Sequence, residues 1–599
     1  MTDFAQQLKS VVQVISKSYN NQATHLLQML WQVQQKYSYI SDDVIDLLAE
    51  DLNLSRAHVQ GVAEFYSFFH RTPRGEYDIY FSDNIIEHMQ GKHALQTQLL
   101  EKLKVKLGKP RADGRVTVDN TACIGMSDQG PAMLVNGLTI TRLTPQKIDL
   151  IAELVEQQKP LREWPCDWFD VKENIQRKHI LLGENFEPGS AIQVVLNKGS
   201  DGTLREIEVA GLRGCGGAGF PTHKKWLFCR DTVADERIVI CNADEGEPGT
   251  FKDRVLLQSY ADLVFEGMTV CAATIGAKKG FLYLRGEYRY LQKSLETVLA
   301  KRREAGLLGE NILGQEGFDF DIEIHLGAGA YICGAELALI ESLEGNRGIP
   351  RKHPPPYPVN AGYLDKPTVV NNVETFALAA KIMVYTGKRF ATLGTDRSKG
   401  TKLISVSGDC DRPGVYEVPF GITVREMLDM CGAQNVQAVQ NSGPAGVCIS
   451  ADEFDHQLCF EDLNSTGSFM IFGQQRDMLE VIRNFTQFFV HESCGFCTPC
   501  RVGTSVMKNL VDKIHSGHGT KVDLQDMENL SHIMKTMSNC GLGLTASNAV
   551  ADTLKKFPQV YEERLQAEVS LAPSFDLDAA LEAARQVVHR DDETAHIAA

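Results

Sequence analysis

The stretch RIVICNADEGEPGTFKDR occupies residues 237–254 and says most about the fold. It opens with a short apolar run, 237–241, of the kind that forms a buried strand. Three carboxylates then fall within four residues: Asp244, Glu245 and Glu247. Such a group either lies in a solvated loop or accepts hydrogen bonds from a ligand at the carboxyl end of a strand. Taken alone, this stretch leaves both interpretations open.

A glycine-rich loop, GLRGCGGAGFP, precedes this stretch at residues 211–221 and contains a G-x-G-x-x-G pattern. Glycine lets the backbone approach a phosphate or a flat ring closely. A standard dinucleotide fingerprint also needs a preceding strand, for which only 205–209 is available, and a carboxylate about 20 residues later, which is absent. Further glycine and asparagine loops at 327–334 and 370–374 are of a type that cradles ligands.

Cysteines form the third feature, in the stretch HESCGFCTPCR at residues 491–501. Cys494, Cys497 and Cys500 are spaced three residues apart in one tight loop, and Cys540 is the only later cysteine. This spacing matches one face of an iron–sulfur cube better than the two separate knuckles of a tetrahedral zinc site. Zinc and buried structural cysteines remain the alternatives.

Composition limits the class of protein. A chain of 599 residues is too long for a single core, and 43% apolar with 23% charged residues is typical of a folded globular protein. The formal net charge of −16 argues against nucleic acid or an anionic membrane as the main partner. The sequence has neither an apolar run long enough to span a membrane nor a signal-peptide pattern, so we expect a cytoplasmic protein.

The periodicity of the sequence suggests several domains. We expect a helical region followed by strands, an irregular linker, a mixed α/β domain, a β-rich β-grasp-like module, a helical bundle and a polar tail, at residues 1–155, 156–195, 196–397, 398–477, 478–567 and 568–599 respectively.

Five motifs together carry a family resemblance: GLRGCGGAGFPTHKKW, CNADEGEPGTFKDR, GAGAYICGAE, KPTVVNNVE and ESCGFCTPC. They resemble the flavin subunit of respiratory complex I, and the first 150 residues resemble its thioredoxin-like small subunit, here fused in front. This fusion is most similar to diaphorase α subunits of NAD-reducing [NiFe] hydrogenases. The resemblance implies an α/β multidomain fold with an N-terminal helical plus thioredoxin-like domain, a Rossmann-like FMN/NAD domain, the β-grasp-like module and a C-terminal helical bundle with an iron–sulfur cluster.

The resemblance also implies one FMN, one NAD(H) site and one [4Fe-4S] cluster. The FMN contacts fall on Gly214, Gly216, Gly217, Lys225, Asn242, Asp244, Glu245, Tyr331, Gly334, Asn371 and Asn372. The NAD contacts fall on Phe220, Phe228, Glu247, Glu336 and Tyr357, and the cluster ligands on Cys494, Cys497, Cys500 and Cys540. Hydride passes between cofactors, so no catalytic acid or base is expected, and Glu247 positions the nucleotide.

The N-terminal domain departs from the family. Its relatives bind a [2Fe-2S] cluster through four cysteines, and the matching positions here are Ser82, Glu87, Cys123 and Ser127. Because one thiolate falls short of the usual four ligands, we predict no 2Fe-2S cluster in this domain.

The resemblance implies the reaction H2 + NAD+ ⇌ NADH + H+. The expected partners are a ferredoxin-like iron–sulfur diaphorase subunit and the large and small subunits of a [NiFe] hydrogenase, in a hetero-oligomer. The alternative within the family is the NAD-reducing subunit of a soluble formate dehydrogenase or another complex I-like NADH dehydrogenase module. A non-catalytic scaffold with structural zinc is the alternative from a different class.

Overall fold

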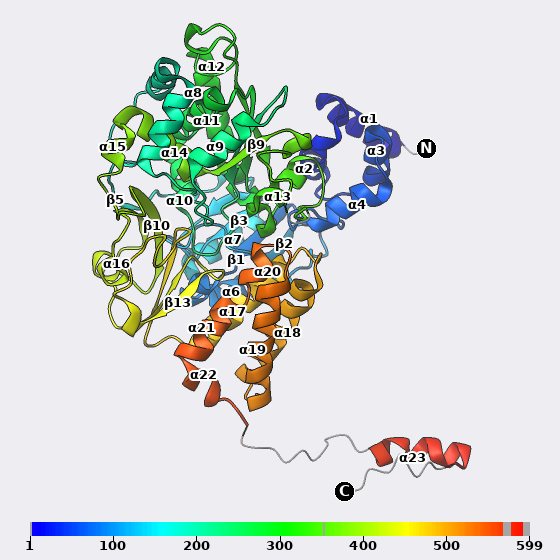
Figure 1. The fold of residues 1–599 in the computed structure, drawn as a ribbon. Coiled ribbons are helices and arrows are strands. Elements are labelled where there is room, and N and C mark those ends of the chain that lie inside the picture. The colour runs from blue at the N-terminus through cyan, green and yellow to red at the C-terminus, as the bar shows by residue number, and fades with distance from the viewer. Residues whose placement is uncertain (1–2, 352–353, 567–576, 591–599) are drawn as a thin grey trace.

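The computed structural model describes residues 3–351, 354–566 and 577–590. Along the chain it forms an N-terminal part, a central α/β part, a β-rich module and a C-terminal helical bundle (Figure 1). Within these described residues the strands build three sheets, two of four strands and one of six. No helix in the same residues is both long and apolar enough to cross a membrane.

The N-terminal part begins with helices and continues into a small sheet of order β2-β1-β3-β4. The helices are α1 (Asp3–Ser18), α2 (Leu26–Tyr37), α3 (Asp42–Leu52) and α4 (Arg56–Phe65). The sheet and its helices comprise β1 (Tyr77–Ser82), α5 (Ile85–Met89), α6 (Lys92–Leu103), β2 (Val116–Thr121), β3 (Met133–Val135), β4 (Leu138–Ile140) and α7 (Pro145–Glu156). β1 runs parallel to β2 and antiparallel to β3, and α6 packs against α7.

The central part is built on a parallel sheet of order β8-β7-β6-β9. Its strands are β6 (Ile238–Ala243), β7 (Lys279–Leu284), β8 (Asp321–Leu326) and β9 (Thr368–Asn372). β6 contains most of the strand predicted at 237–241. Because all four strands run in one direction, the loops that follow them meet at one edge of the sheet. The acidic, glycine-rich and asparagine loops therefore gather there.

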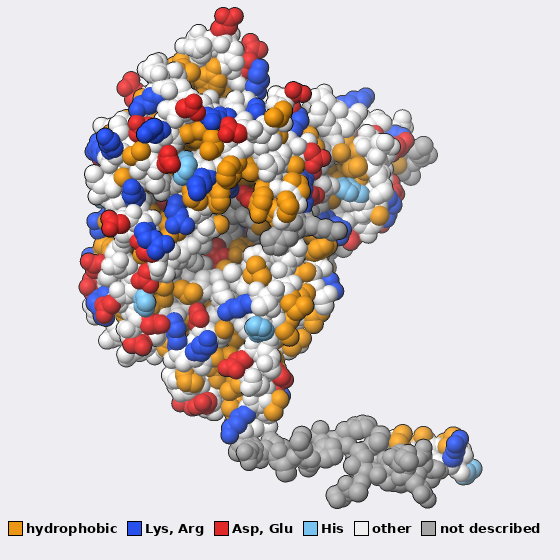
Figure 2. Space-filling view, viewed as in Figure 1, with side chains coloured by type: hydrophobic (Ala, Val, Ile, Leu, Met, Phe, Trp, Pro, Cys, Tyr) orange, Lys and Arg blue, Asp and Glu red, His pale blue; other side chains and the backbone are white. Residues whose placement is uncertain are grey.

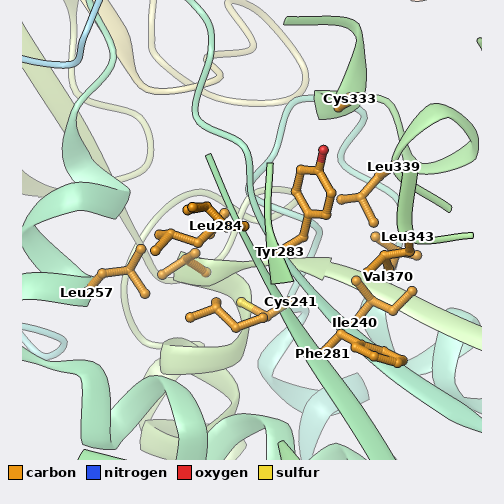
Figure 3. Close-up of a cluster of buried hydrophobic side chains, with 14 of the residues drawn as sticks. Ile240, Cys241, Leu257, Phe281, Tyr283, Leu284, Cys333, Leu339, Leu343 and Val370 are labelled. Atoms are coloured by element: carbon orange, nitrogen blue, oxygen red, sulfur yellow. The ribbon is translucent and has the colours of Figure 1, made fainter. Parts of the chain in front are cut away.

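Helices cover this sheet, and α11 packs against both α8 and α14. They are α8 (Ser190–Ala210), α9 (Thr222–Asp231), α10 (Lys252–Ser259), α11 (Ala261–Ile275), α12 (Gln292–Glu304), α13 (Glu336–Leu343), α14 (Val373–Tyr385) and α15 (Gly387–Phe390). Ile240, Phe281 and Leu339 lie on one side of the sheet, with Cys241 and Leu257 on the other (Figure 3). Both faces of the sheet are thus buried, as expected for parallel strands.

The segment 205–209 is not a strand, because it lies inside α8. Leu204, Ile207 and Ala210 are buried there at intervals of three residues, a spacing that places them on one face of a helix. The glycine-rich loop therefore follows a helix instead of a strand.

The β-rich module has a six-stranded sheet of order β13-β12-β14-β10-β11-β5. Its elements are β5 (Ile175–Arg177), β10 (Thr401–Gly408), β11 (Gly414–Pro419), α16 (Val424–Cys431), β12 (Val436–Asn441), β13 (Val447–Ser450) and β14 (Ser468–Gly473). The single α-helix α16 begins at a capping box formed by Thr423 and Glu426. β5 belongs to the segment 156–195 and forms an edge of this sheet, where it pairs with β11.

The C-terminal bundle lies below the rest in Figure 1, in orange and red. Its helices are α17 (Met478–Glu492), α18 (Thr498–His515), α19 (Lys521–Met537), α20 (Gly541–Thr545), α21 (Asn548–Lys556) and α22 (Pro558–Glu562), and a further helix, α23 (Leu577–Val588), follows. α23 lies within the segment 568–599 predicted to be a polar tail.

A buried ion pair joins the central part to the N-terminal sheet domain. The Arg254 guanidinium donates to both carboxylate oxygens of Asp128, at 3.0 and 2.9 Å, and to the carbonyl of Gly125 at 3.0 Å. Neither side chain of the pair is exposed. A bidentate pair of this kind fixes orientation, and breaking it leaves a buried charge without a partner.

We predict that Arg254→Met destabilises the protein by about 3–5 kcal/mol, because Asp128 keeps a buried, unpaired charge. Thermal unfolding followed by circular dichroism measures the effect. Arg425→Met, which removes an exposed pair with Asp455, is the control and should leave the midpoint nearly unchanged. The double variant Arg254→Met/Asp128→Leu should recover much of the loss, and an unchanged midpoint in Arg254→Met would contradict the assignment.

Candidate functional site

The loops after β6 and β8 are held together by Asn242. Its Nδ2 donates to the carbonyl of Gly334 at 2.8 Å, and its Oδ1 accepts from the backbone N–H of Asp244 at 3.0 Å. The Oδ2 atom of Asp244 is buried without a hydrogen-bond partner among the described residues. Burial raises the pKa of Asp244 well above its ordinary value. An unsatisfied buried acceptor in a cradle of this kind suits a polar ligand.

The glycine-rich loop packs against the end of β9. The N–H of Gly214 donates to the carbonyl of Phe220 at 2.9 Å, which closes the loop. A Cβ atom at Gly216 would lie 3.4 Å from the Cβ of Asn372. Gly217 has a φ of 126°, a conformation that other residues rarely adopt. The structure therefore places Gly216 beside Asn372, and both are predicted to contact FMN.

Two residues of α9 contact the asparagine loop. The Nζ of Lys225 donates to Glu336 at 2.9 Å and to the carbonyl of Val370 at 3.0 Å. Trp226 is fully buried, and its Nε1–H donates to Oδ1 of Asn371 at 2.9 Å. Because Oδ1 of Asn371 is occupied in this way, its amide orientation is set. Nothing in the local sequence pattern around Trp226 shows that its side chain reaches a residue 145 positions away.

Asn372 is held by a network of buried charges, which we call the charge network: Lys252, Asp253, Glu374 and Lys402. Asp253 accepts from Nδ2 of Asn372 at 2.6 Å, and the backbone N–H of Glu374 donates to Oδ1 of Asn372 at 3.0 Å. Lys252 lies 2.7 Å from Asp253 and 3.0 Å from Glu374, and Lys402 lies 2.7 Å from Glu374. Burial opposes ionisation of Glu374, but the two ammonium groups hold its pKa below the ordinary value.

Glu245 has a different environment from its neighbours. Its two oxygens accept from the backbone N–H groups of Asp253 and Arg254, at 2.8 and 3.0 Å, and the Tyr288 hydroxyl donates to it at 2.9 Å. The carboxylate thus caps the start of α10. Its assignment as an FMN contact stays a prediction.

Glu247 lies between the central part and the β-rich module. It accepts from the Tyr331 hydroxyl and, at 2.9 Å, from the backbone N–H of Ala445. Burial raises its pKa to about 7, against the effect of both hydrogen bonds. Its carboxyl group therefore titrates near neutral pH, which is uncommon for a glutamate.

The aromatic residues predicted to contact NAD are exposed. The exposed fractions are 43% for Phe220, 48% for Phe228 and 55% for Tyr357. We use the name loop edge for the edge of the parallel sheet where the loops after its strands meet. Single exposed aromatic residues are common, but three on the segments around the loop edge give faces on which a base can stack. Their contact with a nucleotide stays a prediction.

All four predicted cluster cysteines line one hollow, together with Ile332 and Pro350: Cys494, Cys497, Cys500 and Cys540. Cys497 immediately precedes α18, and Cys540 immediately precedes α20. No three His, Cys, Asp or Glu side chains in the described part of the chain gather tightly enough to hold a single metal ion. The thiols surround a space instead of a point, and four thiolates are the ordinary donor set of an iron–sulfur cube.

The loop that follows β8, which contains Tyr331 and Gly334 of the predicted FMN site, shares the segment 331–334 with the cysteine hollow. Tyr331 hydrogen-bonds Glu247, and its neighbour Ile332 lines the hollow. From the other side, Glu492 of α17 accepts from the backbone N–H of Tyr331 at 2.9 Å. The Phe488 ring of the same helix packs edge-on against Tyr331 at 5.0 Å.

The four positions of the N-terminal domain that match the family's cluster ligands are all buried. The sulfur of Cys123 lies 3.6 Å from Oγ of Ser127, and Ser82 accepts from the backbone N–H of Ile124 at 3.3 Å. Glu87 accepts from the N–H of Ala132 at 3.0 Å, and its Oε1 has no hydrogen-bond partner among the described residues.

Comparison with known families and proteins places these features. Residues 12–156 match the thioredoxin-like [2Fe-2S] ferredoxin family, 207–381 the Nuo51 FMN-binding domain, and 480–564 the NADH-ubiquinone oxidoreductase-F iron–sulfur binding region. The NAD-reducing hydrogenase HoxS subunit alpha of Cupriavidus necator is 44% identical over 588 residues, which cover 96% of this chain and 98% of that protein. The chain therefore belongs to the family of NAD-reducing hydrogenase HoxS alpha subunits.

Two further relatives extend the comparison. A crystal structure of an NAD+-reducing [NiFe]-hydrogenase in the H2-reduced state contains a chain with 42% sequence identity and a TM-score of 0.88, covering 97% of this chain and 99% of that one. The NADP-reducing hydrogenase subunit HndC of Solidesulfovibrio fructosivorans is 41% identical over 367 residues, covering 59% of this chain and 74% of that protein. The predicted fold class and family resemblance are confirmed.

One prediction is wrong. We expected no 2Fe-2S cluster in the N-terminal domain, but the match of residues 12–156 to a [2Fe-2S] ferredoxin family points to one. The prediction rested on counting thiols alone. Cys123 is the single thiol among the four matching positions, and Ser82, Glu87 and Ser127 present oxygen atoms, so these side chains differ from the four thiolates of ordinary clusters.

We predict that Trp226→Phe weakens FMN binding about five- to tenfold, because Asn371 loses the donor that orients its amide. The fluorescence of FMN released on denaturation measures how much FMN the purified chain retains after dialysis, and this amount falls as the affinity falls. Trp168→Phe, a substitution of a buried tryptophan in another part of the chain, serves as the control. Equal FMN affinity in Trp226→Phe and the control would show that Trp226 has no such role.

Proposed function

We propose that this chain is the diaphorase subunit of an NAD-reducing hydrogenase, which moves electrons between NAD(H), FMN and a [4Fe-4S] cluster in the reaction H2 + NAD+ ⇌ NADH + H+. One observation carries this proposal. The segment 331–334 belongs both to the loop edge of the flavin-type sheet and to the hollow lined by four cysteines. Two redox centres held there would be close neighbours.

The loop edge would hold FMN through Gly214, Gly216, Gly217, Lys225, Asn242, Asp244, Glu245, Tyr331, Gly334, Asn371 and Asn372. Bound FMN exchanges electron pairs with nicotinamide and single electrons with iron–sulfur centres. The protein's own contribution is rigidity. Trp226 and Asp253 each fix one amide of the asparagine pair, and the glycine loop leaves room for a close approach.

The nucleotide would lie beside Glu247, with Phe220, Phe228, Glu336 and Tyr357 around it. A carboxylate accepts hydrogen bonds from ribose hydroxyl groups, and Tyr331 and Ala445 hold that of Glu247 in place. Lys225 offsets the charge of Glu336 at 2.9 Å. Cys494, Cys497, Cys500 and Cys540 would ligate the [4Fe-4S] cluster.

A protein partner would accept or supply the electrons at the bundle. Six large apolar side chains are exposed on the cysteine loop, α18 and α19: Phe496, Val502, Val506, Val522, Ile533 and Met537. Hydrophobic side chains gather along this bundle in Figure 2. Exposed apolar groups in such numbers are typical of an interface. We propose a ferredoxin-like iron–sulfur subunit at this surface, with the [NiFe] hydrogenase pair beyond it, in the cytoplasm.

We predict that NADH binds about three- to tenfold more tightly at pH 8 than at pH 6. With a pKa of about 7, Glu247 is mostly protonated below neutrality, and it becomes a stronger acceptor as the pH rises through that value. Equilibrium binding of NADH at several pH values tests this. Glu247→Gln should bind more weakly and without this pH dependence. Equal NADH affinity in wild type and Glu247→Gln would contradict the assignment.

We also predict that Cys497→Ala stops electron transfer to protein partners, whereas NADH oxidation by an artificial two-electron acceptor partly survives. The reason is that the alanine removes a cluster ligand while the loop edge remains intact. Steady-state assays with both acceptors measure the split, and Cys448→Ala, at a buried cysteine outside the hollow, is the control. Loss of both activities in a folded, flavin-loaded Cys497→Ala variant would contradict this order of centres.

Metal analysis of the complex that co-purifies with the chain tests the function itself. Nickel is the expected result for the hydrogenase assignment. Molybdenum or tungsten without nickel would replace it by the formate dehydrogenase alternative.

A further inference from the structure

Two cysteines outside the cysteine hollow lie side by side in the β-rich module. Cys410 is in the loop between β10 and β11, and Cys431 is the last residue of α16. The backbone N–H of Arg412 donates to the carbonyl of Cys431 at 3.0 Å. A Cβ atom at Gly432 would meet the side chain of Asp411 at 2.9 Å. The residues that follow each cysteine are therefore in direct contact, and the two chain segments cannot separate without breaking the module.

The two thiols interact with each other. The Cys410 side chain packs against the apolar cluster that contains Cys431, whose own S–H donates to the carbonyl of Leu428 at 3.3 Å. Cys431 is fully buried, whereas Cys410 is partly exposed at the edge of the module's core. Cys410 thus lies between the Cys431 sulfur and solvent, and only a small oxidant can pass it to reach Cys431.

The charge around this pair favours reactivity. The interaction between the two thiols lowers the pKa of Cys431 despite burial and, together with burial, raises the pKa of Cys410. The N–H of Ala433 and the Arg412 guanidinium also lower the pKa of Cys431. The Arg412 side chain is held there by a bond to the carbonyl of Met430 at 2.6 Å. In the same module, burial raises the pKa of the isolated thiol Cys448 to about 12. Thiolate character beside a second thiol is the usual setting of a redox-active pair.

We propose that Cys410 and Cys431 are a modification site that hydrogen peroxide converts into a reversible disulfide. Peroxide takes an electron pair from the Cys431 thiolate sulfur, so the O–O bond breaks, a sulfenic acid forms and one water is released. The Cys410 sulfur then attacks the sulfenic sulfur, the S–S bond forms, the S–O bond breaks and a second water leaves. The sum is two thiols plus H2O2 giving one disulfide and two waters.

The disulfide would join the β10–β11 loop to the end of α16. It uses none of the four thiols that line the cysteine hollow. Peroxide would therefore modify the β-rich module without modifying the thiols that line the cysteine hollow. A thiol reductant reverses the bond and restores both side chains.

The test treats the intact chain with hydrogen peroxide, then denatures it, alkylates the free thiols with iodoacetamide and analyses its peptides by mass spectrometry. We expect a linked peptide pair containing Cys410 and Cys431, lost on dithiothreitol treatment. Its thiols should disappear about tenfold faster than that of Cys448, the matched buried control. Cys448→Ser should keep the linked pair, and Cys410→Ser should abolish it.

Two results would overturn the proposal: alkylation of both cysteines as complete as that of Cys448 after peroxide, or a linkage of Cys410 to any cysteine other than Cys431. Cys410→Ser changes a partly exposed side chain, so we expect this variant to fold more readily than Cys431→Ser. Should Cys431→Ser fail to fold, the wild type and Cys410→Ser still decide the question.

Discussion

The charge network of Lys252, Asp253, Glu374 and Lys402 is the constraint on which the arrangement of the redox sites depends. Four ionisable side chains are stable at this depth only as partners of one another, because removing one leaves a buried charge that costs about 3–5 kcal/mol. Lys402 belongs to β10 of the β-rich module, and the other three belong to the central part. The network thus joins two domains, and Asn372 at the loop edge is attached to it by a hydrogen bond of 2.6 Å.

The same logic applies at the other borders of the loop edge. Tyr331 receives a contact from each side: Glu247 from the central sheet, Phe488 and Glu492 from the bundle. Glu247 in turn is held by Ala445 of the β-rich module. Three domains therefore meet within a few residues of segment 331–334. A flavoprotein that must hand electrons to an iron–sulfur centre needs its domains fixed in this way, since small displacements slow the transfer.

The sequence predicted those features that depend on local patterns. The strand within 237–254 has a clear apolar run, and the cysteine spacing at 494–500 brings its members together without help from the rest of the chain. Trp226, Asp253 and Lys252 went unnoticed because their partners, Asn371 and Asn372, lie more than a hundred residues away. The segment 205–209 was considered as a strand because its apolar and polar residues alternate, but it lies inside the helix α8. In the N-terminal domain, counting thiols gave the wrong expectation about a cluster, whereas the fold of residues 12–156 carries the family signal.

The central claim is that a flavin and an iron–sulfur cube lie beside each other and exchange electrons with NAD(H). The most direct measurement is the visible absorption spectrum of the anaerobically purified chain before and after addition of NADH. The account predicts flavin bands over broad iron–sulfur absorption, with the flavin bands bleached by NADH. A colourless protein, or a coloured one whose spectrum does not respond to NADH, would contradict it.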